Sequence, residues 1–388
     1  MEEIEEQVVE IRGLDTEDPV DRTILTRDEL REKTEEDFQE DYSEEEASDD
    51  SIELAVLGLV EPGFDFYNFY LDLLSTSILG SYDLEEEKMY IVQGVGFEGN
   101  ERLTYAHEYA HVLQDKNYNI DEDLGYNEES CEEDSEKCAG VQALIEGEAS
   151  FVEIAWLSLY ATEEDILEIQ EFYQNYEPPT SESDPPFILE DQAFPYQTGM
   201  EFVQHLYEEG GWEAIDAAYL NPPVSTEQIL HPERYPDDQP VPVELPDLTS
   251  YLGNGWRSLS EDVIGEWYTY LILAQGSDPE ARISDSRART AAEGWAGDAY
   301  EILYHDELES TVLVSHYLWE SSREASQYAE AFLEHANIRY GAPLSNEGGI
   351  TSWETEEGFT LFTLNGEETF WITAPDEETA RGLLEQVQ

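Results

Sequence analysis

The sequence predicts an α+β protein in which a mostly helical domain with a small edge sheet is followed by a lobe of helices and antiparallel strands. Three observations support this fold class. Long segments before residue 250 repeat apolar residues at helical spacing, residues 82–92 have the pattern of a hairpin, and residues 310–387 follow the order strand, helix, strand, strand, helix. With 388 residues, 40% of them hydrophobic and 12% aromatic, the chain can bury a substantial core.

Shifts in composition divide the chain into three parts. Residues 1–50 are dominated by acids and form a segment that packs on or precedes the main domain. Residues 51–248 form that mostly helical domain, and residues 249–388 form the C-terminal helical and α+β lobe. A loop rich in proline precedes the second boundary.

The acidic N-terminal segment is expected to be partly ordered. Residues 2–14 repeat apolar residues at helical spacing, and residues 22–38 suggest a strand that runs into a helix capped near Thr26. The acidic stretch 42–51 is expected to be a solvated surface segment or the edge of a helix.

The main domain is expected to consist of long helices joined by polar loops. The helices are predicted at residues 53–79 with a break at Pro62-Gly63, 100–117, 139–161, and 195–223 with a break at Gly210-Gly211. A hairpin whose second strand is Met89–Val92 precedes the second of these helices. The loops are predicted between residues 118 and 138, at 174–195 and at 224–248.

The C-terminal lobe is expected to begin with helices. These are predicted at residues 260–275 and 286–294, followed by an aromatic-and-glycine turn at 294–300. The alternating strands and helices that complete the lobe are predicted at residues 310–319, 322–341, 358–366, 368–375 and 376–387.

The charge balance of the chain is extreme. There are 93 acidic and 17 basic residues, which gives a formal net charge of −76. Such a surface repels phosphates and anionic lipid headgroups, so nucleic acid is excluded as a partner. The sequence contains no apolar run of the length that a membrane-spanning helix needs. Two interpretations of the charge remain open, namely adaptation to high salt, which screens self-repulsion, and an acidic face on an ordinary secreted protein.

The two cysteines bear on the compartment. Cys131 and Cys138 lie seven residues apart in a polar stretch, which suits a local disulfide and favours an extracellular or cell-surface location. The start of the chain has no basic and apolar signal pattern, so an export signal would have been removed. Two free thiols are the alternative.

The segment HEYAH carries the chemistry. Positions i and i+4 of a helix lie on one face, so His107 and His111 can present two imidazoles to one metal ion, and Glu108 follows the first ligand. Neutral imidazole is a good Zn²⁺ ligand, and the glutamate is placed to take a proton from a metal-bound water. Because the chain has only 7 histidines, an accidental match to this pattern is uncommon. The alternative is a pair of buried structural histidines.

A catalytic zinc needs a third protein ligand and one open position. A third histidine further along the same helix is excluded, since Gln114 and Asn117 occupy the positions of the extended motif. The apolar helix at 139–161 offers Glu146 and Glu148, which point to different sides. We predict Glu146 as the ligand and expect the small residues Gly147 and Ala149 to let this helix approach the first one closely.

These residues resemble a known group of enzymes. HEYAH followed by a glutamate in an E-G-x-A helix is similar to the gluzincin clan of zinc metallopeptidases, and more specifically to peptidase-MA-like proteins of prokaryotes. The resemblance covers residues 50–240 and includes ILGSYDLEEEKMYIV, LTYAHEYAHVLQD, ALIEGEASFVE and PVSTEQILHPERY. It implies a zincin-like catalytic domain, Zn²⁺ held by His107, His111 and Glu146, and a peptide or protein substrate. It also implies an Asp or Glu further along the ligand helix that supports a histidine ligand. In this chain the position one turn on is Ser150 and the position two turns on is Glu153, and which of them supports a histidine stays open.

Peptide hydrolysis also needs a donor for the oxyanion of the tetrahedral intermediate. His231, with Tyr235 beside it, is predicted for this role because a proline-fixed loop holds it. The alternatives are a structural role for His231 and donation by Tyr105, Tyr109 or Tyr196. Asp115 could orient the His111 ring or begin the loop that follows the helix.

The sequence therefore predicts zinc-dependent peptide hydrolysis with Glu108 as general base and His231 as a second catalytic residue. No other cofactor-binding pattern, nucleophile elbow or cysteine–histidine dyad is present in the sequence. Two other functions remain open. One is a catalytically inactive surface or binding protein with the same fold, adapted to high salt. The other is a metal-dependent hydrolase that acts on non-peptide amides.

Overall fold

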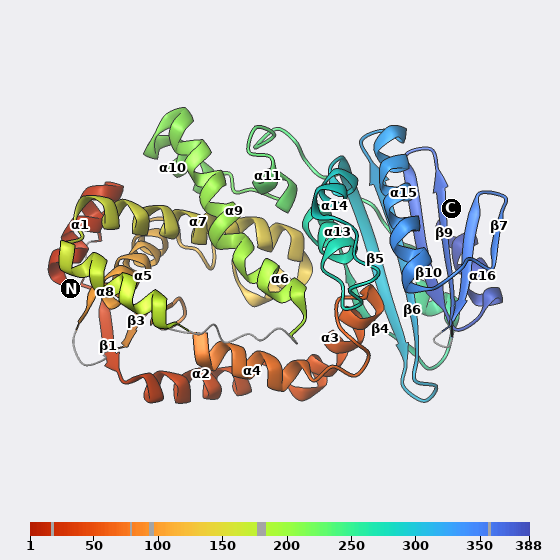
Figure 1. Cartoon of the computed structure of the whole chain (residues 1–388), viewed down its shortest axis with the longest axis horizontal. Coiled ribbons are helices and arrows are strands. Elements are labelled where there is room, and N and C mark those ends of the chain that lie inside the picture. The colour runs from red at the N-terminus through yellow and green to blue at the C-terminus, as the bar shows by residue number, and fades with distance from the viewer. Residues whose placement is uncertain (17–18, 78–79, 93–96, 177–183, 356–357) are drawn as a thin grey trace.

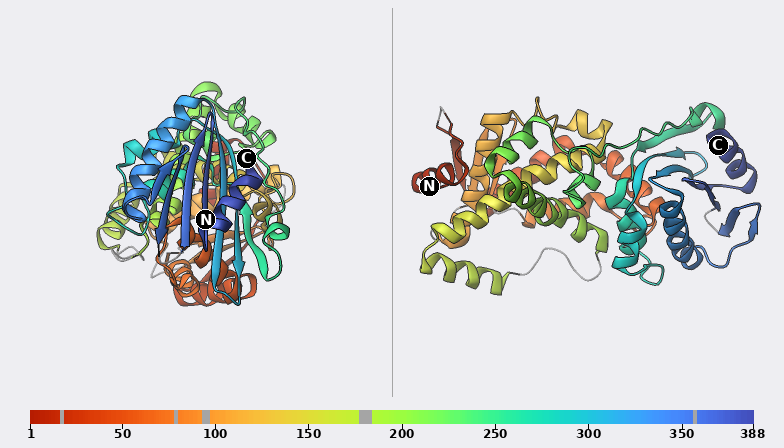
Figure 2. Two further views of the ribbon diagram at one scale, coloured as in Figure 1. Left: turned by 90° about the vertical axis from the view of Figure 1, so that its right-hand side faces the viewer. Right: turned by 90° about the horizontal axis from the view of Figure 1, so that it is seen from above.

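The computed structural model of the chain has the predicted α+β architecture (Figure 1). It describes residues 1–16, 19–77, 80–92, 97–176, 184–355 and 358–388. Helices with a three-stranded sheet form one end of an elongated molecule, and a seven-stranded antiparallel sheet with its helices forms the other (Figure 2). Among the described residues, no helix combines the length and apolar composition needed to cross a bilayer.

The acidic N-terminal segment is mostly helical. Its elements are α1 (Glu2–Arg12), β1 (Asp21–Leu25), α2 (Arg27–Asp41) and α3 (Glu44–Leu57). The predicted cap is confirmed, because the Thr26 hydroxyl accepts from the Glu29 backbone amide and closes a capping box on α2. Most of the acidic stretch 42–51 lies in the first turns of α3, where acids favour the positive end of the helix dipole.

The N-terminal segment contacts both ends of the molecule. Ile4 and Val8 of α1 are buried against α5 and α7 of the main domain. At the other end, Asp49 of α3 accepts two hydrogen bonds of 2.7 Å from Arg257 of the C-terminal lobe. Helix α3 thus continues past the boundary predicted at residue 50 and joins the two parts (Figure 1).

A small mixed sheet lies at the helical end of the molecule. The predicted hairpin is present as β2 (Gly80–Asp83) and β3 (Lys88–Val92), which pair antiparallel. The strand β1 adds in parallel on the other side of β3, so the order is β1-β3-β2. This order leaves β2 at an edge of the sheet.

The long helices predicted for the main domain are present, and the differences lie mainly in the segments predicted as loops. The domain contains α4 (Phe66–Ser77), α5 (Gly99–Tyr118), α6 (Glu128–Glu133), α7 (Ser135–Leu159), α8 (Glu163–Asn175), α9 (Pro186–Gly210), α10 (Trp212–Leu220) and α11 (Thr226–Leu230). The next helix, α12 (Leu248–Leu252), packs on the sheet of the C-terminal lobe. The breaks at Pro62-Gly63 and at Gly210-Gly211 are confirmed.

All three loop predictions in this domain were wrong in part, the third because residues 226–230 form α11. The acidic stretch before residue 138 contains α6 and the first turn of α7, with Cys131 and Cys138 joined by a disulfide. In the loop predicted at 174–195, the helix α9 already begins at Pro186, because proline fits the first turn of a helix where its missing N–H costs nothing. Residues 177–183 of that predicted loop lie outside the described residues.

The C-terminal lobe is built on the seven-stranded sheet. Its elements are β4 (Trp256–Asp262), α13 (Gly265–Ala274), α14 (Asp285–Ala292), β5 (Trp295–His305), β6 (Ser310–Trp319), α15 (Ser322–Arg339), β7 (Ser345–Glu347), β8 (Ile350–Thr355), β9 (Gly358–Asn365), β10 (Glu368–Ala374) and α16 (Glu377–Val387). The order is β4-β5-β6-β10-β9-β8-β7, and every neighbouring pair is antiparallel.

Helices cover both faces of this sheet. Aromatic side chains on one face pack against α13, α14 and α15, and aliphatic ones on the other pack against α12 and α16. Two predictions were wrong here, because residues 260–262 belong to β4 and residues 295–300 to β5. The glycine taken as part of a turn, Gly297, sits at a β-bulge where an added Cβ would lie 2.1 Å from the Val241 carbonyl oxygen.

Candidate metal centre

Helix α5 places two imidazoles on one face. Its apolar positions, such as Ala106 and Ala110, are buried between α1, α7 and α8, which fixes the rotation of the helix. His107 and His111 are one turn apart, and their ring centroids are 4.8 Å from each other. The i, i+4 spacing read from the sequence is therefore realised as two adjacent rings.

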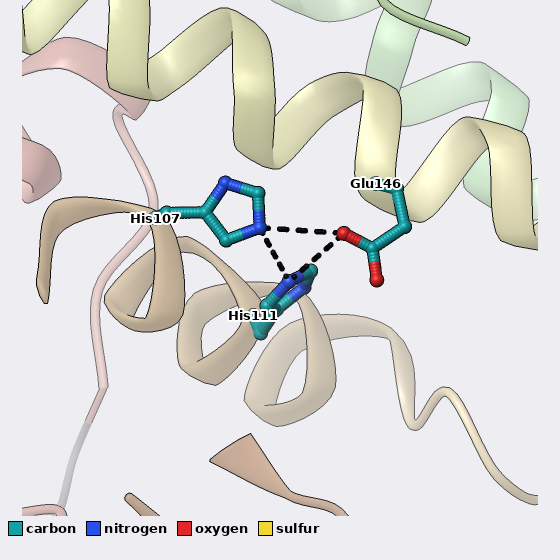
Figure 3. Close-up of side chains that lie close together, drawn as sticks. All are labelled: His107, His111 and Glu146. Atoms are coloured by element: carbon teal, nitrogen blue, oxygen red, sulfur yellow. Dashed lines mark hydrogen bonds and ion pairs between the residues drawn. The ribbon is translucent and has the colours of Figure 1, made fainter. Parts of the chain in front are cut away.

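Helix α7 brings the Glu146 carboxylate to these rings (Figure 3). Its Oε2 atom lies 3.3 Å from Nε2 of His107 and 3.4 Å from Nε2 of His111, and the two Nε2 atoms are 3.2 Å apart. The three side chains predicted as metal ligands thus point at a common centre.

A second hydrogen bond fixes each ring. Nδ1 of His107 faces the Glu153 carboxylate at 3.2 Å, and Nδ1 of His111 faces the Gln114 side-chain oxygen at 2.8 Å. Both partners are acceptors, so each Nδ1 carries the proton and each Nε2 of a neutral ring offers a lone pair. Three lone pairs then face one another at hydrogen-bond distance, an arrangement that a shared cation stabilises.

The spacing suits zinc. In a tetrahedral site with ligand distances of about 2.0–2.1 Å, neighbouring ligand atoms are about 3.3 Å apart. The three distances in this cluster, 3.2 to 3.4 Å, agree with that value. Two imidazoles and one carboxylate, with a fourth position left for solvent, is also a donor set found in catalytic zinc sites. The residues present therefore fit the ion that the sequence predicts.

The pKa shifts of the ligands indicate that the cluster favours a bound positive charge. Burial lowers the pKa of His107, but hydrogen bonds to Glu146 and Glu153 outweigh it and raise that pKa to about 10. Burial acts to raise the pKa of Glu146, yet the two histidines lower it below the usual range of a glutamate. In the absence of an ion, the site therefore binds a proton strongly.

Glu108 stands beside the three ligands without pairing with them. Burial raises its pKa, and the charges of His107 and His111 act in the opposite direction. The side chain also lies next to the edge strand, because a Cβ at Gly80 would be 3.5 Å from the Glu108 Cγ. A carboxylate with a raised pKa next to a metal position is suited to accept and return a proton.

The outer partners of the ligands differ from some of those considered in the sequence. Of the two candidates on α7, Glu153 contacts a ligand ring, whereas Asp115 on α5 accepts a hydrogen bond of 2.8 Å from the Tyr82 hydroxyl. Gln114 was missed as a partner of His111. Its signal in the sequence was a polar amide three residues after the ligand, on an otherwise apolar helix face.

Glu148 lies on the other side of α7, as predicted, and has a different role. It is 1% exposed and forms an ion pair with Arg12 of α1. The close approach expected at Gly147 is made to α9 and not to α5, since an added Cβ would lie 2.2 Å from the Gly199 carbonyl carbon. Ala149 packs in the core shared with α5, as expected.

The structure does not bring His231 to the ligands. Its Nε2 pairs with Glu266 of α13 at 2.9 Å. It ends α11, whose first residue Thr226 bonds to Glu136, and ten residues of α7 separate Glu136 from Glu146. Ten residues of helix span about 15 Å, so the prediction of His231 as oxyanion donor is corrected. Tyr235 also faces away, with its hydroxyl on the Asn221 carbonyl oxygen.

Tyr196 takes the place that His231 was expected to fill. It lies on α9, and its ring is 6.1 Å from the ring of His107. Burial, followed by the charges of Glu146 and Glu108, raises the pKa of its hydroxyl, so the group stays protonated and able to donate. The other two tyrosines considered are engaged elsewhere: Tyr105 bonds to Glu5, and Tyr109 packs in the core with α1.

The similarity to known families that was found lies in the C-terminal lobe. A family model described as a domain of unknown function, DUF8575, matches residues 254–384. Searches of curated proteins and of solved structures found no match. The matched residues span β4 to α16, and the histidine–glutamate cluster lies outside them.

Proposed function

We propose that the protein is a zinc-dependent hydrolase of peptide bonds, similar to the gluzincin metallopeptidases. The observation that carries this proposal is the convergence of the His107, His111 and Glu146 ligand atoms at 3.2 to 3.4 Å, with Glu108 alongside. A structural zinc site closes the tetrahedron with a fourth protein ligand, whereas a three-ligand set leaves a position for solvent.

The chain supplies the groups that hydrolysis requires. A bound zinc ion acidifies water and polarises a carbonyl group. The Glu108 carboxylate takes a proton from the attacking water and delivers it to the leaving amine. Tyr196 donates its hydroxyl hydrogen to the developing oxyanion, because it is the protonated hydroxyl that flanks the cluster. Glu153 and Gln114 keep the two ligand rings in place.

The position of β2 favours a peptide over a small amide. The strand lies at the edge of its sheet, and Gly80 packs against Thr104 and Glu108 of α5. An extended peptide that adds to this edge would form main-chain hydrogen bonds with β2 and pass beside the Glu108 side chain. A small non-peptide amide has no extended main chain that could form these hydrogen bonds with β2.

The test combines metal analysis with one substitution. We expect one zinc per chain in both the wild type and Glu108→Gln, and complete loss of peptide hydrolysis in the variant, because the amide cannot accept the proton. Glu164→Gln, the same change at an exposed position of α8, is the matched control and should keep full activity. A broad peptide library supplies the substrates.

Each other outcome of this experiment rejects part of the proposal. Activity that survives Glu108→Gln would end the peptidase assignment. Zinc without turnover of any peptide would favour the inactive binding protein, and turnover of amides outside the library would favour the non-peptide hydrolase.

A second substitution tests the oxyanion donor. Tyr196→Phe should lower kcat by about 10²–10³ while zinc content and KM change little, because the lost hydrogen bond forms in the transition state. Tyr207→Phe, which removes a hydroxyl from a tyrosine 40% exposed on the same helix, should have no effect. Equal kcat values for the two variants would show that another group stabilises the oxyanion.

We further propose that the protein works outside the cell in a salty medium. The disulfide between Cys131 and Cys138 and the formal net charge of −76 support this proposal. Added potassium chloride should raise the free energy of unfolding, since it screens the repulsion between surface acids. Denaturant titrations at low and high salt measure this effect, and a stability that does not rise with salt would contradict the proposal.

A further inference from the structure

The orientation of the Gln114 side chain is dictated from two sides. Its Nε2 atom donates to the Ile145 carbonyl oxygen at 2.9 Å and to Oε2 of Glu148 at 3.0 Å. Turning the amide over would place its oxygen against these two acceptors. The side-chain oxygen therefore faces Nδ1 of His111, as observed at 2.8 Å. The amide thus forces His111 to carry its proton on Nδ1 and to leave Nε2 free for the metal.

The Glu148 carboxylate holds the Gln114 amide, and Arg12 holds that carboxylate in turn. Glu148 and Arg12 are 1% and 2% exposed, and the Arg12 Nε donates to Oε1 of Glu148. The Tyr219 hydroxyl donates to Oε2 of the same carboxylate. Arg12 also donates from Nη2 to Asp216 at 2.6 Å, so its own charge is shared between two acids. The Glu148 carboxylate is thus fixed at the position where it accepts from Gln114.

We propose that Arg12 of the N-terminal helix is a positioning residue of the metal centre, acting through Glu148 and Gln114 to set the tautomer of His111. This inference rests on the proposed zinc site. Without Arg12, the Glu148 carboxylate loses a donor that fixes its position and can turn away from Gln114. The Gln114 amide can then turn over and present its N–H to His111. Nδ1 must then accept, and the proton moves to Nε2, the atom that the metal needs.

The inference assigns a role to α1 that its position in the chain does not suggest. A pro-segment covers a cleft and is removed without harm to the ligands. Helix α1 instead packs against the two helices that carry the ligands. Ile4 and Val8 lie in the core that α5 and α7 share. Removal of the first twelve residues is therefore expected to weaken zinc binding and not to expose an active site.

The experiment measures zinc affinity by competition with a chelator in the full-length chain. Arg12→Met should bind zinc about 10–100-fold more weakly than the wild type, the range typical of lost outer-shell partners. Arg12→Lys keeps a positive charge beside Glu148 and should recover part of the affinity. The matched control is Arg22→Met, which removes an ion pair with Glu5 and a hydrogen bond of 2.7 Å to Tyr105 of α5 but touches neither Gln114 nor Glu148.

A spectroscopic readout separates positioning from general destabilisation. In zinc-loaded protein labelled with ¹⁵N-histidine, the Nδ1–H signal of His111 should exchange slowly with water in the wild type and Arg22→Met. In Arg12→Met it should exchange faster or disappear, because its acceptor is no longer held. If Arg12→Met fails to fold, the double variant Arg12→Met with Glu148→Met leaves no buried unpaired charge and should show the same weakened binding.

The outcomes separate this inference from the proposed function. Equal zinc affinity and equal exchange in the wild type and Arg12→Met would overturn the role of Arg12 while leaving the zinc site intact. The same holds if Arg22→Met weakens binding as much as Arg12→Met. A wild type that binds no zinc would overturn both.

Discussion

Two groups of ligand-type side chains in the described part of the chain bring three potential ligand atoms close together. The first is the cluster of His107, His111 and Glu146. The second, which we call the Arg234 cluster, consists of Glu227, Asp238 and Glu320. By spacing alone both resemble metal sites.

The two clusters differ in what neutralises them. Nη1 of Arg234 lies among the three acids of its cluster, 2.5 Å from Glu227, 2.6 Å from Glu320 and 3.5 Å from Asp238. The Arg234 guanidinium is therefore the cation of that cluster, and no external ion is needed to neutralise it. Among the described residues, no arginine or lysine pairs with the histidine cluster, and its ring protons are directed outward to Glu153 and Gln114.

In so acidic a protein, the convergence of carboxylates does not by itself identify a metal site. With 93 acids in 388 residues, some carboxylates must converge by chance, and convergence alone is weak evidence. An internal guanidinium satisfies such a group, whereas imidazoles whose second nitrogens are committed to acceptors leave lone pairs that need an external ion. The outer hydrogen bonds, more than the spacing of the acids, distinguish the two.

The largest expected effect comes from a substitution that removes a ligand from the histidine cluster and leaves the Arg234 cluster unchanged. Glu146→Gln should lower zinc affinity by more than about 100-fold, beyond the loss typical of an outer-shell change, because a charged ligand is removed. Glu320→Gln makes the same change in the Arg234 cluster and should leave zinc affinity as it is. Chelator competition measures both. Equal losses in the two variants would show that the clusters had been wrongly distinguished.

The next prediction converts one kind of cluster into the other. Arg234→Met leaves three carboxylates facing one another and should lower the free energy of unfolding by roughly 1–3 kcal/mol, less than for a fully buried pair because Asp238 and Glu320 are about 40% exposed. Added calcium should restore part of that loss, since a divalent ion binds the folded state. Thermal unfolding with calcium or with chelator measures this effect.

The wild type is the control for this conversion. Its unfolding should respond to calcium much less than that of Arg234→Met, because the guanidinium already fills the centre of the cluster. A wild type that gains as much stability from calcium as the variant would remove the physical distinction drawn between the clusters.

The histidine ligands could be predicted from the sequence because their geometry is local. A helix fixes the relation between His107 and His111, and the apolar pattern around them states that the helix is buried. Glu146 was found because it interrupts another long apolar helix. The α+β class followed from hydrophobic periods in the same way, and the strands that were missed, such as β4 and the start of β5, contain glycine or polar residues that obscure that period.

The remaining parts of the site depend on contacts between distant segments. Arg12 and Glu148 are 136 residues apart, and nothing local marks either as a partner of the other. Tyr196 was placed at the start of the helix predicted from residue 195, but nothing local showed that α9, which begins at Pro186, would carry it to the ring of His107. His231 had a persuasive local setting, but α11 packs at the far end of α7, where Glu266 binds it.

The smallest expected effect concerns the pH response of the Arg234 cluster. Burial and the nearby charge of Glu266 raise the pKa of Glu227 to about 8, even beside Arg234. The folded protein then binds a proton at this site between about pH 4.5 and 8 that the unfolded chain releases, so this group's contribution to stability falls as pH rises through that window. Urea titrations at the two ends should show that Glu227→Gln reduces the fall by about 1–2 kcal/mol. Glu320→Gln, which changes an exposed member of the same cluster, should leave the fall as it is, and an equal reduction in both variants would mean that the net charge of the cluster, and not the buried carboxyl, sets the response.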